Sequence, residues 1–270
     1  MKKGIFLGAV VLLMAVGMAQ SQEGALHGKI DLTWTSKYIW RGFDVYGDKA
    51  AIHPTIDLDL FGTGLHFSTE AHRANSSGHE LTERWDYTIY YLGQILEGEL
   101  YQTNYRVGYV YYNYPDMSSH TTGSIDLQEL HAIFSWPNIL PVEGLMPSYC
   151  LVRLMPANSG TLVGGGAPDG TASGFAHIFM LDYGLPMTCP FTGDTRTLNL
   201  HSEFIYNDGV SPRGGNVDHD WSNAVFGVTT TFDLGNSLYL TPGVYYQSSW
   251  DDSVNNEDEC WVSLGMAYKF

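Results

Sequence analysis

Apolar and polar residues alternate with a period of two along most of this sequence. In the last such segment, Val262, Leu264 and Met266 alternate with Ser263 and Gly265. Successive side chains of a β-strand point to opposite faces, so this pattern predicts strands with one apolar and one polar face. Twelve segments bounded by turn residues show it: 28–43, 50–61, 65–74, 83–96, 99–114, 126–137, 145–157, 173–186, 195–206, 221–234, 237–250 and 259–270.

The links between these segments alternate in length. Tight turns are predicted at 61–64, 97–98 and 233–237, whereas 158–172 and 207–220 are long and polar. Outer-membrane barrels have short turns on one side and longer loops on the other. A sheet in hydrocarbon must also close on itself, because an open edge leaves backbone groups unpaired. The sequence therefore predicts an all-β fold, a transmembrane antiparallel up-and-down β-barrel of about 12 strands.

Both ends of the chain support export to the bacterial outer membrane. Lys2 and Lys3 precede an apolar run and the small residue Ala19, which is typical of a signal peptide over 1–19. The barrel domain is then 20–270. The final Phe270 resembles the aromatic signal that the barrel-insertion machinery reads. A soluble β-sandwich also alternates, but the signal peptide, the link lengths and Phe270 favour the barrel.

The charge balance excludes a nucleic-acid partner. The chain has 29 acidic residues against 13 Lys and Arg, a formal net charge of −16, and phosphates require a basic surface. Charged residues make up only 16% of the chain, below the ~25% of ordinary soluble domains. We therefore expect outer-membrane lipid and lipopolysaccharide as surroundings, and small solutes as the other partners.

The opening segment 28–43 places charges beside aromatic rings. Tyr38 and Trp40 share the face predicted to meet lipid, whereas Lys37 and Arg41 share the face predicted to meet enclosed water. The same parity, applied to every segment, gives the candidate pore-lining residues: Asp31, Lys37, Arg41, Asp57, Asp59, Glu70, Arg84, Asp86, Arg106, Glu129, Arg153, Asp182 and Glu203.

Acids outnumber bases among these inward residues, which favours cations over anions if the lumen is open. Mutually neutralised structural pairs without selectivity are an equal alternative. Twelve strands give an intermediate bore, between barrels filled by side chains and wide channels. Lys37 and Arg41, with Asp57 and Asp59 on the next strand, are expected to form a lumen charge cluster with a structural role.

No catalytic, cofactor or metal site is predicted. His66, Glu70 and His72 share one strand face, but such pairs spread apart and would need partners elsewhere to hold zinc. Polar lining is the favoured interpretation. His201 and Ser202 are adjacent, so they point to opposite faces and cannot form a Ser–His pair. We therefore expect a protein that is not an enzyme.

The three cysteines are too scattered for a disulfide scaffold. Cys150 and Cys189 could pair in an oxidising periplasm, which would leave Cys260 single. Three small apolar side chains without a disulfide are the favoured interpretation.

The stretch S-K-Y-I-W-R-G-F at 36–43, followed by G-D-K-A at 47–50 and the pair T-I-D-L-D-L and G-L-H-F-S, resembles the TorF-like porin family. Members typically begin their barrel with S-x-Y-x-[WF]-R-G. The resemblance extends over residues 31–76 and implies an outer-membrane barrel of porin type. It implies no particular solute.

Together these observations predict a porin-like channel for passive diffusion of small solutes, favouring cationic or neutral ones. A structural or surface-display barrel with a closed lumen is the first alternative. An outer-membrane lipid hydrolase is the second alternative.

Overall fold

The computed structural model describes residues 26–116, 126–157, 173–188, 193, 195–212 and 217–270. The predicted signal peptide lies outside them. The described chain is almost entirely antiparallel strand, with one 3-10 turn, η1 (Glu80–Thr82). The strands are β1 (His27–Thr35), β2 (Ile39–Trp40), β3 (Phe43–Asp44), β4 (Ala51–Asp59), β5 (Leu65–Ala74), β6 (Arg84–Ile95), β7 (Thr103–Asn113), β8 (Leu127–Ser135), β9 (Leu145–Pro156), β10 (Gly174–Thr188), β11 (Thr195–Asp208), β12 (His219–Thr230), β13 (Phe232–Gly235), β14 (Leu238–Ser249) and β15 (Glu259–Lys269).

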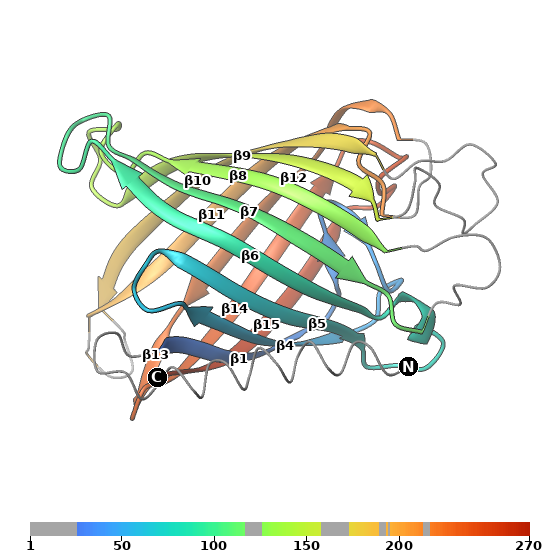
Figure 1. Ribbon diagram of the computed structural model, residues 1–270, viewed down its shortest axis with the longest axis horizontal. Coiled ribbons are helices and arrows are strands. Elements are labelled where there is room, and N and C mark those ends of the chain that lie inside the picture. The colour runs from blue at the N-terminus through green and yellow to red at the C-terminus, as the bar shows by residue number, and fades with distance from the viewer. Residues whose placement is uncertain (1–25, 117–125, 158–172, 189–192, 194, 213–216) are drawn as a thin grey trace.

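Twelve of these strands form the wall of a closed barrel (Figure 1). From β4 to β12 each strand pairs with the next along the chain, and β12 pairs with β14. β1 pairs with β4 on one side and with β15 on the other, which closes the sheet. The short β13 lies beside β14 at one end of the wall. Closure leaves no wall edge unpaired, and the predicted twelve-stranded barrel is confirmed.

The links lie at two ends of different character. Tight turns such as 60–64 and 96–102 lie at the end where β1 begins and β15 finishes, which we call the turn end. The links 36–50, 75–83 and 250–258 lie at the opposite end, which we call the loop end. Figure 1 shows the turn end on the left, beside the C-terminus. These links match the predicted alternation of link lengths, whereas the predicted long link 158–172 and part of the link 207–220 lie outside the described residues.

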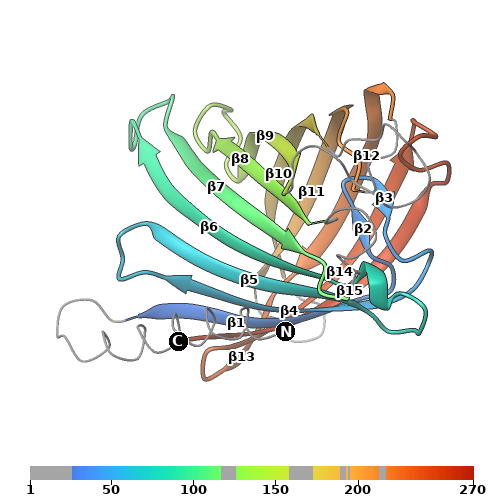
Figure 2. The same cartoon turned by 45° about the vertical axis from the view of Figure 1, so that its right-hand side comes forward.

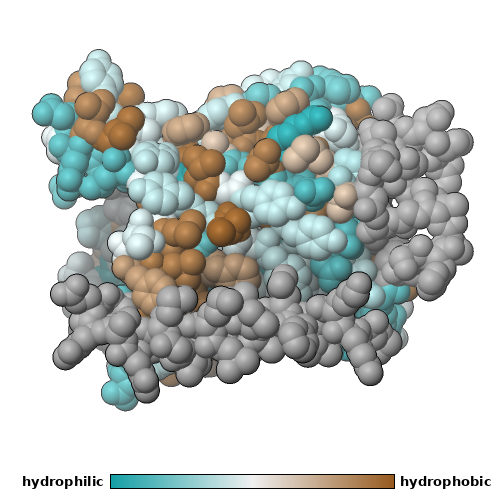
Figure 3. Space-filling view, viewed as in Figure 1, coloured by the Kyte–Doolittle hydropathy of each residue, from teal (hydrophilic) through white to brown (hydrophobic). Residues whose placement is uncertain are grey.

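The outer face of the wall is apolar. Leu32, Val107 and Val244 are 52%, 49% and 54% exposed, and Met266 is 50% exposed. An apolar surface of this extent on a water-soluble protein would be unusual, whereas a membrane-spanning barrel requires it. Figure 3 shows apolar side chains among pale aromatic ones on the described part of one face.

The first predicted segment is wrong beyond Thr35, where β1 ends. Residues 36–50, which we call the plug segment, turn into the barrel at the loop end instead of continuing along the wall. The hairpin of β2 and β3 forms its tip, and Figure 2 shows this hairpin within the barrel. The hairpin turns at Arg41 and Gly42, which have φ of 50° and 93°. Gly accepts this conformation without steric cost, whereas it is uncommon for Arg.

Tyr38 and Trp40 therefore face the lumen, not lipid, which corrects the prediction from parity. Tyr38 is only 7% exposed, and Trp40 packs against the buried clusters of the interior. The physical reason is that a twelve-stranded barrel is wider than its own inward side chains can fill. A returning segment of chain supplies the missing volume, and its aromatic residues pack best there.

The lumen at the loop end is consequently dry and apolar on one side. Inward side chains of β7 to β11, together with Val210 just after β11, form a buried cluster against which Trp40 packs. Its members are Val110, Tyr112, Leu127, Cys150, Val152, Leu154, Ala176, Ile178, Ile205 and Val210.

Arg153 was predicted to line the pore, and that prediction is wrong. On β9 the side chains of Val152 and Leu154 are fully buried inside, so Arg153 between them faces outward. Its guanidinium lies over the ring of Phe175, 4.5 Å from the centroid, and donates a hydrogen bond to Ser173. The alternation is inverted here because the lumen beside the plug segment is apolar, whereas the rim outside it is polar.

Two of the three cysteines are described. Cys150 is buried, Cys260 is exposed, and both are free thiols. Cys189 lies outside the described residues, and the free Cys150 agrees with the favoured interpretation of cysteines without a disulfide. Among the described residues, no helix has the length and apolar composition needed to cross a bilayer.

Candidate functional site: the barrel lumen

Two tyrosines anchor the plug segment to β5. The ring of Tyr38 stacks on His72 with centroids 4.8 Å apart and an interplanar angle of 10°. Tyr38 Oη also accepts a hydrogen bond from Arg84 Nη2 at 2.9 Å. Tyr46 is fully buried and donates its hydroxyl hydrogen to the backbone oxygen of His72 at 2.7 Å. Buried aromatic rings with satisfied hydroxyls are strong anchors, so this side of the plug segment is held firmly.

The tip of the hairpin is held by a buried ion pair. Arg41 Nη2 donates to Glu129 Oε1 at 2.8 Å, and Arg41 Nη1 lies 2.7 Å from Glu129 Oε2. The Tyr112 hydroxyl donates to the same carboxylate at 2.6 Å, and His131 Nδ1 lies 3.2 Å from it. The Glu129 side chain is 3% exposed. Such a pair offsets the cost of burying its charges only when further hydrogen bonds satisfy its ions, and Tyr112 and His131 supply them for Glu129.

Two guanidinium groups lie close to the ring of Trp40. The guanidinium carbons (Cζ) of Arg41 and Arg84 lie 4.6 Å and 5.1 Å from the centroid of the indole ring. Tyr112 meets the same ring edge-on at 6.0 Å. Both cations thus gain from the negative face of the indole, which explains why charge and aromatic residues alternate in this stretch without the stretch being a wall strand.

The backbone of the hairpin turn contacts the opposite wall. Gln247 Nε2 donates to the Gly42 carbonyl at 2.9 Å, and Asn223 lies beside it. Gln247 and Asn223 are both fully buried. A Cβ added at Gly42 would lie 2.5 Å from Asn223 Oδ1. The turn therefore fits only a glycine at this position, and the plug segment spans the lumen from β5 to β12 and β14.

Lys37 holds the start of the plug segment to β15. Its ammonium contacts the Asp48 carboxylate closely and lies 2.7 Å from Glu259 Oε2. Hydrogen bonds to Asp48 and then to Glu259 raise the pKa of Lys37 above its usual value. The same hydrogen bond lowers the pKa of Asp48. Lys37 is thus positively charged and paired at physiological pH.

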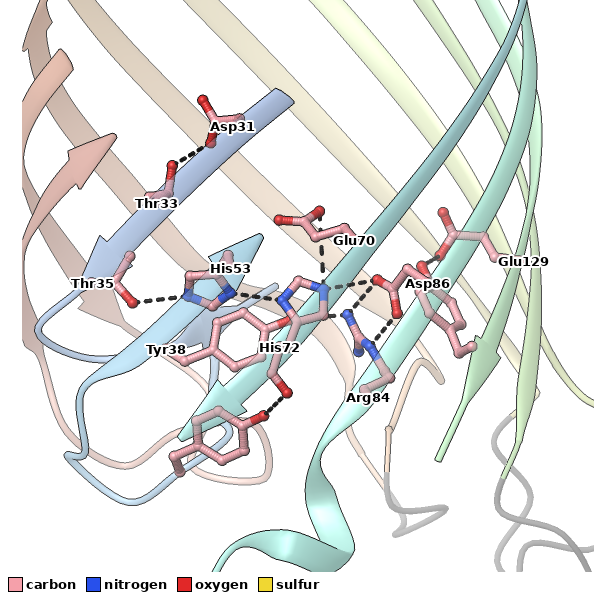
Figure 4. A network of polar contacts seen from close by, with 12 residues as sticks. Asp31, Thr33, Thr35, Tyr38, His53, Glu70, His72, Arg84, Asp86 and Glu129 are labelled. Carbon is pink, nitrogen blue, oxygen red and sulfur yellow. Dashed lines mark hydrogen bonds and ion pairs between the residues drawn. The ribbon is translucent and has the colours of Figure 1, made fainter. Parts of the chain in front are cut away.

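A chain of hydrogen bonds runs beneath the plug segment across β1, β4, β5 and β6 (Figure 4). Thr35 Oγ1 lies 3.0 Å from His53 Nε2, and the two Nδ1 atoms of His53 and His72 are 2.8 Å apart. His72 Nε2 lies 3.0 Å from Asp86 Oδ2, and Asp86 accepts two hydrogen bonds from Arg84. Since Asp86 is the acceptor, His72 carries its proton on Nε2. A cavity of about 250 Å³ borders this chain on the lumen side.

The lumen nearer the turn end is polar and less filled. Asp57 accepts a 2.6 Å hydrogen bond from Tyr90 and lies 3.3 Å from His66 Nδ1. Arg106 lies over the Tyr90 ring at 3.8 Å. A cavity of about 520 Å³ borders Arg106 and its neighbours on β6, β7 and β8. On the opposite wall a separate polar group consists of Asp182, His201 and Glu203, with His201 Nδ1 2.7 Å from Asp182.

The predicted cluster of Lys37, Arg41, Asp57 and Asp59 does not form. Lys37 pairs with Asp48 and Glu259, Arg41 pairs with Glu129, and Asp57 contacts His66 and Tyr90 instead. The cause is the departure of the chain from the wall after β1, which carries Lys37 and Arg41 away from β4. The predicted pore-lining residues that do lie on inward strand faces are Asp31, Asp57, Asp59, Glu70, Arg84, Asp86, Arg106, Glu129, Asp182 and Glu203.

Sequence reasoning missed His53, Asn223 and Gln247. His53 shares strand parity with Asp57, so the pattern that identified Asp57 was sufficient to find it. Asn223 and Gln247 gave no signal beyond being polar and inward. Their contact with Gly42 depends on where the plug segment crosses the lumen, which strand periodicity does not encode.

The fold is that of a β-barrel of the bacterial outer-membrane type, and the comparisons with solved structures agree. A structure described as the NanC porin is 10% identical, with a TM-score of 0.52 over 90% of this chain and all of that one. An outer-membrane channel from Pseudomonas putida F1 is 12% identical, with a TM-score of 0.53 over 93% of this chain and 97% of that one. At such identities the likeness shows the fold alone. No protein-family model and no curated protein matches the sequence, so the resemblance to the TorF-like family stays a prediction.

Proposed function

We propose that the protein is an outer-membrane channel through which small solutes diffuse passively, and that the plug segment narrows it at the loop end. One observation carries this proposal: the lumen nearer the turn end holds a cavity of about 520 Å³, where the polar side chains of Gln94, Asn104, Arg106 and Ser135 lie among apolar ones such as Leu92 and Ile133. A barrel that served only as a scaffold would gain stability by filling this volume with apolar side chains. The porin and the channel among the similar folds support the same interpretation.

The charges that remain accessible in the lumen favour cationic or neutral solutes. The side chains of Asp57, Asp182 and Glu203 are 26%, 39% and 24% exposed. Arg84 is only 4% exposed, and its charge is neutralised by Asp86. Arg41 and Arg84 are thus consumed in buried pairs, whereas these three acids stay partly exposed in the lumen. Arg106 borders the cavity of about 520 Å³ and offsets part of this acidic excess. An acidic lumen raises the local concentration of cations.

A closed barrel with a structural or surface-display role is the second candidate. The observation in its favour is the filling of the loop end by the plug segment and the apolar cluster on β7 to β11. In that case the polar lumen would be a vestibule open only towards the turn end.

Recording from planar lipid bilayers separates the two candidates. The purified protein is compared with a variant in which residues 38–46 are replaced by a Gly–Ser linker of equal length. Conductance of the unmodified protein with a cation-selective reversal potential supports the channel. Conductance of the variant alone supports the closed barrel, and no conductance from either protein contradicts the channel. An anion-selective reversal potential contradicts the assignment of cationic or neutral solutes.

We further propose that the protein is exported and inserted into the outer membrane with lipopolysaccharide around the loop end. The apolar outer face supports this location. Phe270 follows β15 directly and is 43% exposed on the lipid-facing side, where insertion machinery could bind it. Deleting Phe270 is expected to lower the amount of folded barrel in outer-membrane fractions. Unchanged assembly would contradict this role of Phe270.

A further inference from the structure

Three side chains beneath the plug segment have the composition of a transition-metal site. His53 lies on β4, and Glu70 and His72 lie on β5, all on inward faces. One possible ligand atom of each lies within 4.8 Å of one from each of the other two. We propose that His53, His72 and Glu70 bind a divalent late first-row transition metal, such as Zn²⁺, at the edge of the lumen cavity.

The two imidazoles already face each other through the atoms that would bind the ion. Their Nδ1 atoms are 2.8 Å apart. Tetrahedral zinc with bonds of ~2.0–2.1 Å places two nitrogen ligands roughly 3.3 Å apart. A separation of the rings by about 0.5 Å would therefore admit the ion, which replaces the hydrogen bond between them.

The surroundings permit the histidine tautomers that a metal requires. Asp86 accepts a hydrogen bond from His72 Nε2 at 3.0 Å, which leaves the Nδ1 lone pair of His72 free for a metal. His53 Nε2 lies 3.0 Å from the Thr35 hydroxyl, which can accept or donate. His53 can thus shift its proton to Nε2 and offer Nδ1 as well. Tyr38 stacks on His72 and fixes the plane of that ring.

Glu70 supplies the anionic ligand, and the cavity supplies the remaining position. Its side chain is 39% exposed, and one of its carboxylate oxygens lies within 4.8 Å of a ring nitrogen of each histidine, above the imidazole pair in Figure 4. Glu70, His53 and His72 all line the cavity of about 250 Å³, which has room for water as a fourth ligand. Two imidazoles, one carboxylate and one open position suit zinc and its neighbours rather than Mg²⁺ or Ca²⁺.

The local charge balance also favours a divalent cation. The nearby cations, Arg84 and Lys37, are each paired with carboxylates. Including Glu70, the carboxylates exceed these cations by two charges. A second acidic group, Asp44, Asp48 and Glu259, is a weaker candidate because the Lys37 ammonium already binds two of its carboxylates.

The test measures metal binding by the folded barrel in detergent, without a polyhistidine tag and after chelator treatment. Zn²⁺ affinity is measured by competition with a chromophoric chelator, and Co²⁺ is added as a spectroscopic probe. We expect one ion per barrel and a ligand-field spectrum of low-symmetry four-coordinate cobalt. His53→Gln and Glu70→Gln should each lower Zn²⁺ affinity at least tenfold. Asp86→Asn, which changes no ligand, should lower it ~10–100-fold.

His66→Gln is the matched control, because His66 shares the inward face of β5 and also contacts a carboxylate, Asp57. It should leave the affinity unchanged. Glu70→Gln removes only the negative charge of a partly exposed side chain. It therefore tests the site even if the variants at the buried His53 and Asp86 fail to fold. Equal affinity in Glu70→Gln and the unmodified protein, or no binding at micromolar Zn²⁺, would overturn the proposal. Binding is measured without a membrane, so the result is independent of whether the barrel conducts.

Discussion

The buried ion pair of Arg41 and Glu129 allows a quantitative test of how the plug segment is held. Its side chains are 15% and 3% exposed. Removing one partner leaves an uncompensated buried charge, which costs about 3–5 kcal/mol. Replacing both by apolar residues of similar volume is often neutral or stabilising. We therefore expect Arg41→Met and Glu129→Leu each to destabilise the barrel by about 3 kcal/mol or more, and the double variant to recover most of that loss.

The assay is equilibrium unfolding in denaturant, followed by circular dichroism and by the faster gel migration of folded barrels. The two single variants and the double variant form a thermodynamic cycle, with an expected coupling energy of about 3 kcal/mol. The matched control is the ion pair of Arg73 and Glu83, 3.1 Å apart, in which Arg73 is 65% exposed. Its coupling should be about 0.2–1 kcal/mol. Additive losses at Arg41 and Glu129, or equal coupling in the two pairs, would refute the argument from burial.

Three further predictions concern the plug segment and the rim. Gly42→Ala should destabilise the barrel by about 2 kcal/mol or more, whereas Gly47→Ala, at a positive φ in open space, should cost about 1 kcal/mol, both measured by denaturant midpoint. Because Lys37 lowers the pKa of Asp48, their pair stabilises the fold above the usual aspartate pKa and is lost as pH falls through the lowered value. The free energy of unfolding should fall by at most about 0.5 kcal/mol through this pair, because the Asp48 carboxylate is so exposed. Asp48→Asn should remove this contribution to the difference in unfolding free energy between pH 7 and pH 3. A fluorophore on Arg153→Cys, with the exposed native thiol replaced, should be quenched by nitroxide-labelled lipids, and an unquenched signal would place this position inside.

The wall of the barrel could be predicted because each wall strand separates two different environments. The predicted segment 65–74 coincides with β5. The predicted segment 83–96 is one residue longer at each end than β6. The first segment failed because alternation of Tyr38 and Trp40 with charged residues is equally compatible with a lumen hairpin. There the aromatic rings fill space and the charges find buried partners. Apolar–polar alternation shows that the two faces of a segment meet different environments, but it does not say which face points into the lumen.

The partners of the site residues could not be predicted. Parity placed Glu129 on an inward face, but its partner Arg41 lies 88 positions away in the sequence. That contact depends on the bore of the barrel and on the path of the plug segment across it. Arg153 failed for a related reason, since parity was assigned on the assumption that the inward face is polar along the whole strand. Where the lumen is filled, the apolar face is the inner one.

The contacts of the plug segment join the beginning of the chain to its end. Lys37 binds Glu259 across 222 positions, and the Gly42 carbonyl binds Gln247 across 205. Because a chain is synthesised from its N-terminus, this hairpin is made before β14 and β15. The hairpin has no complete binding surface until those last strands have paired with β12 and β1. Closure of the barrel and docking of the β2–β3 hairpin are therefore coupled steps. A chain truncated before β14 would keep the plug segment but lack the strands that its hairpin binds.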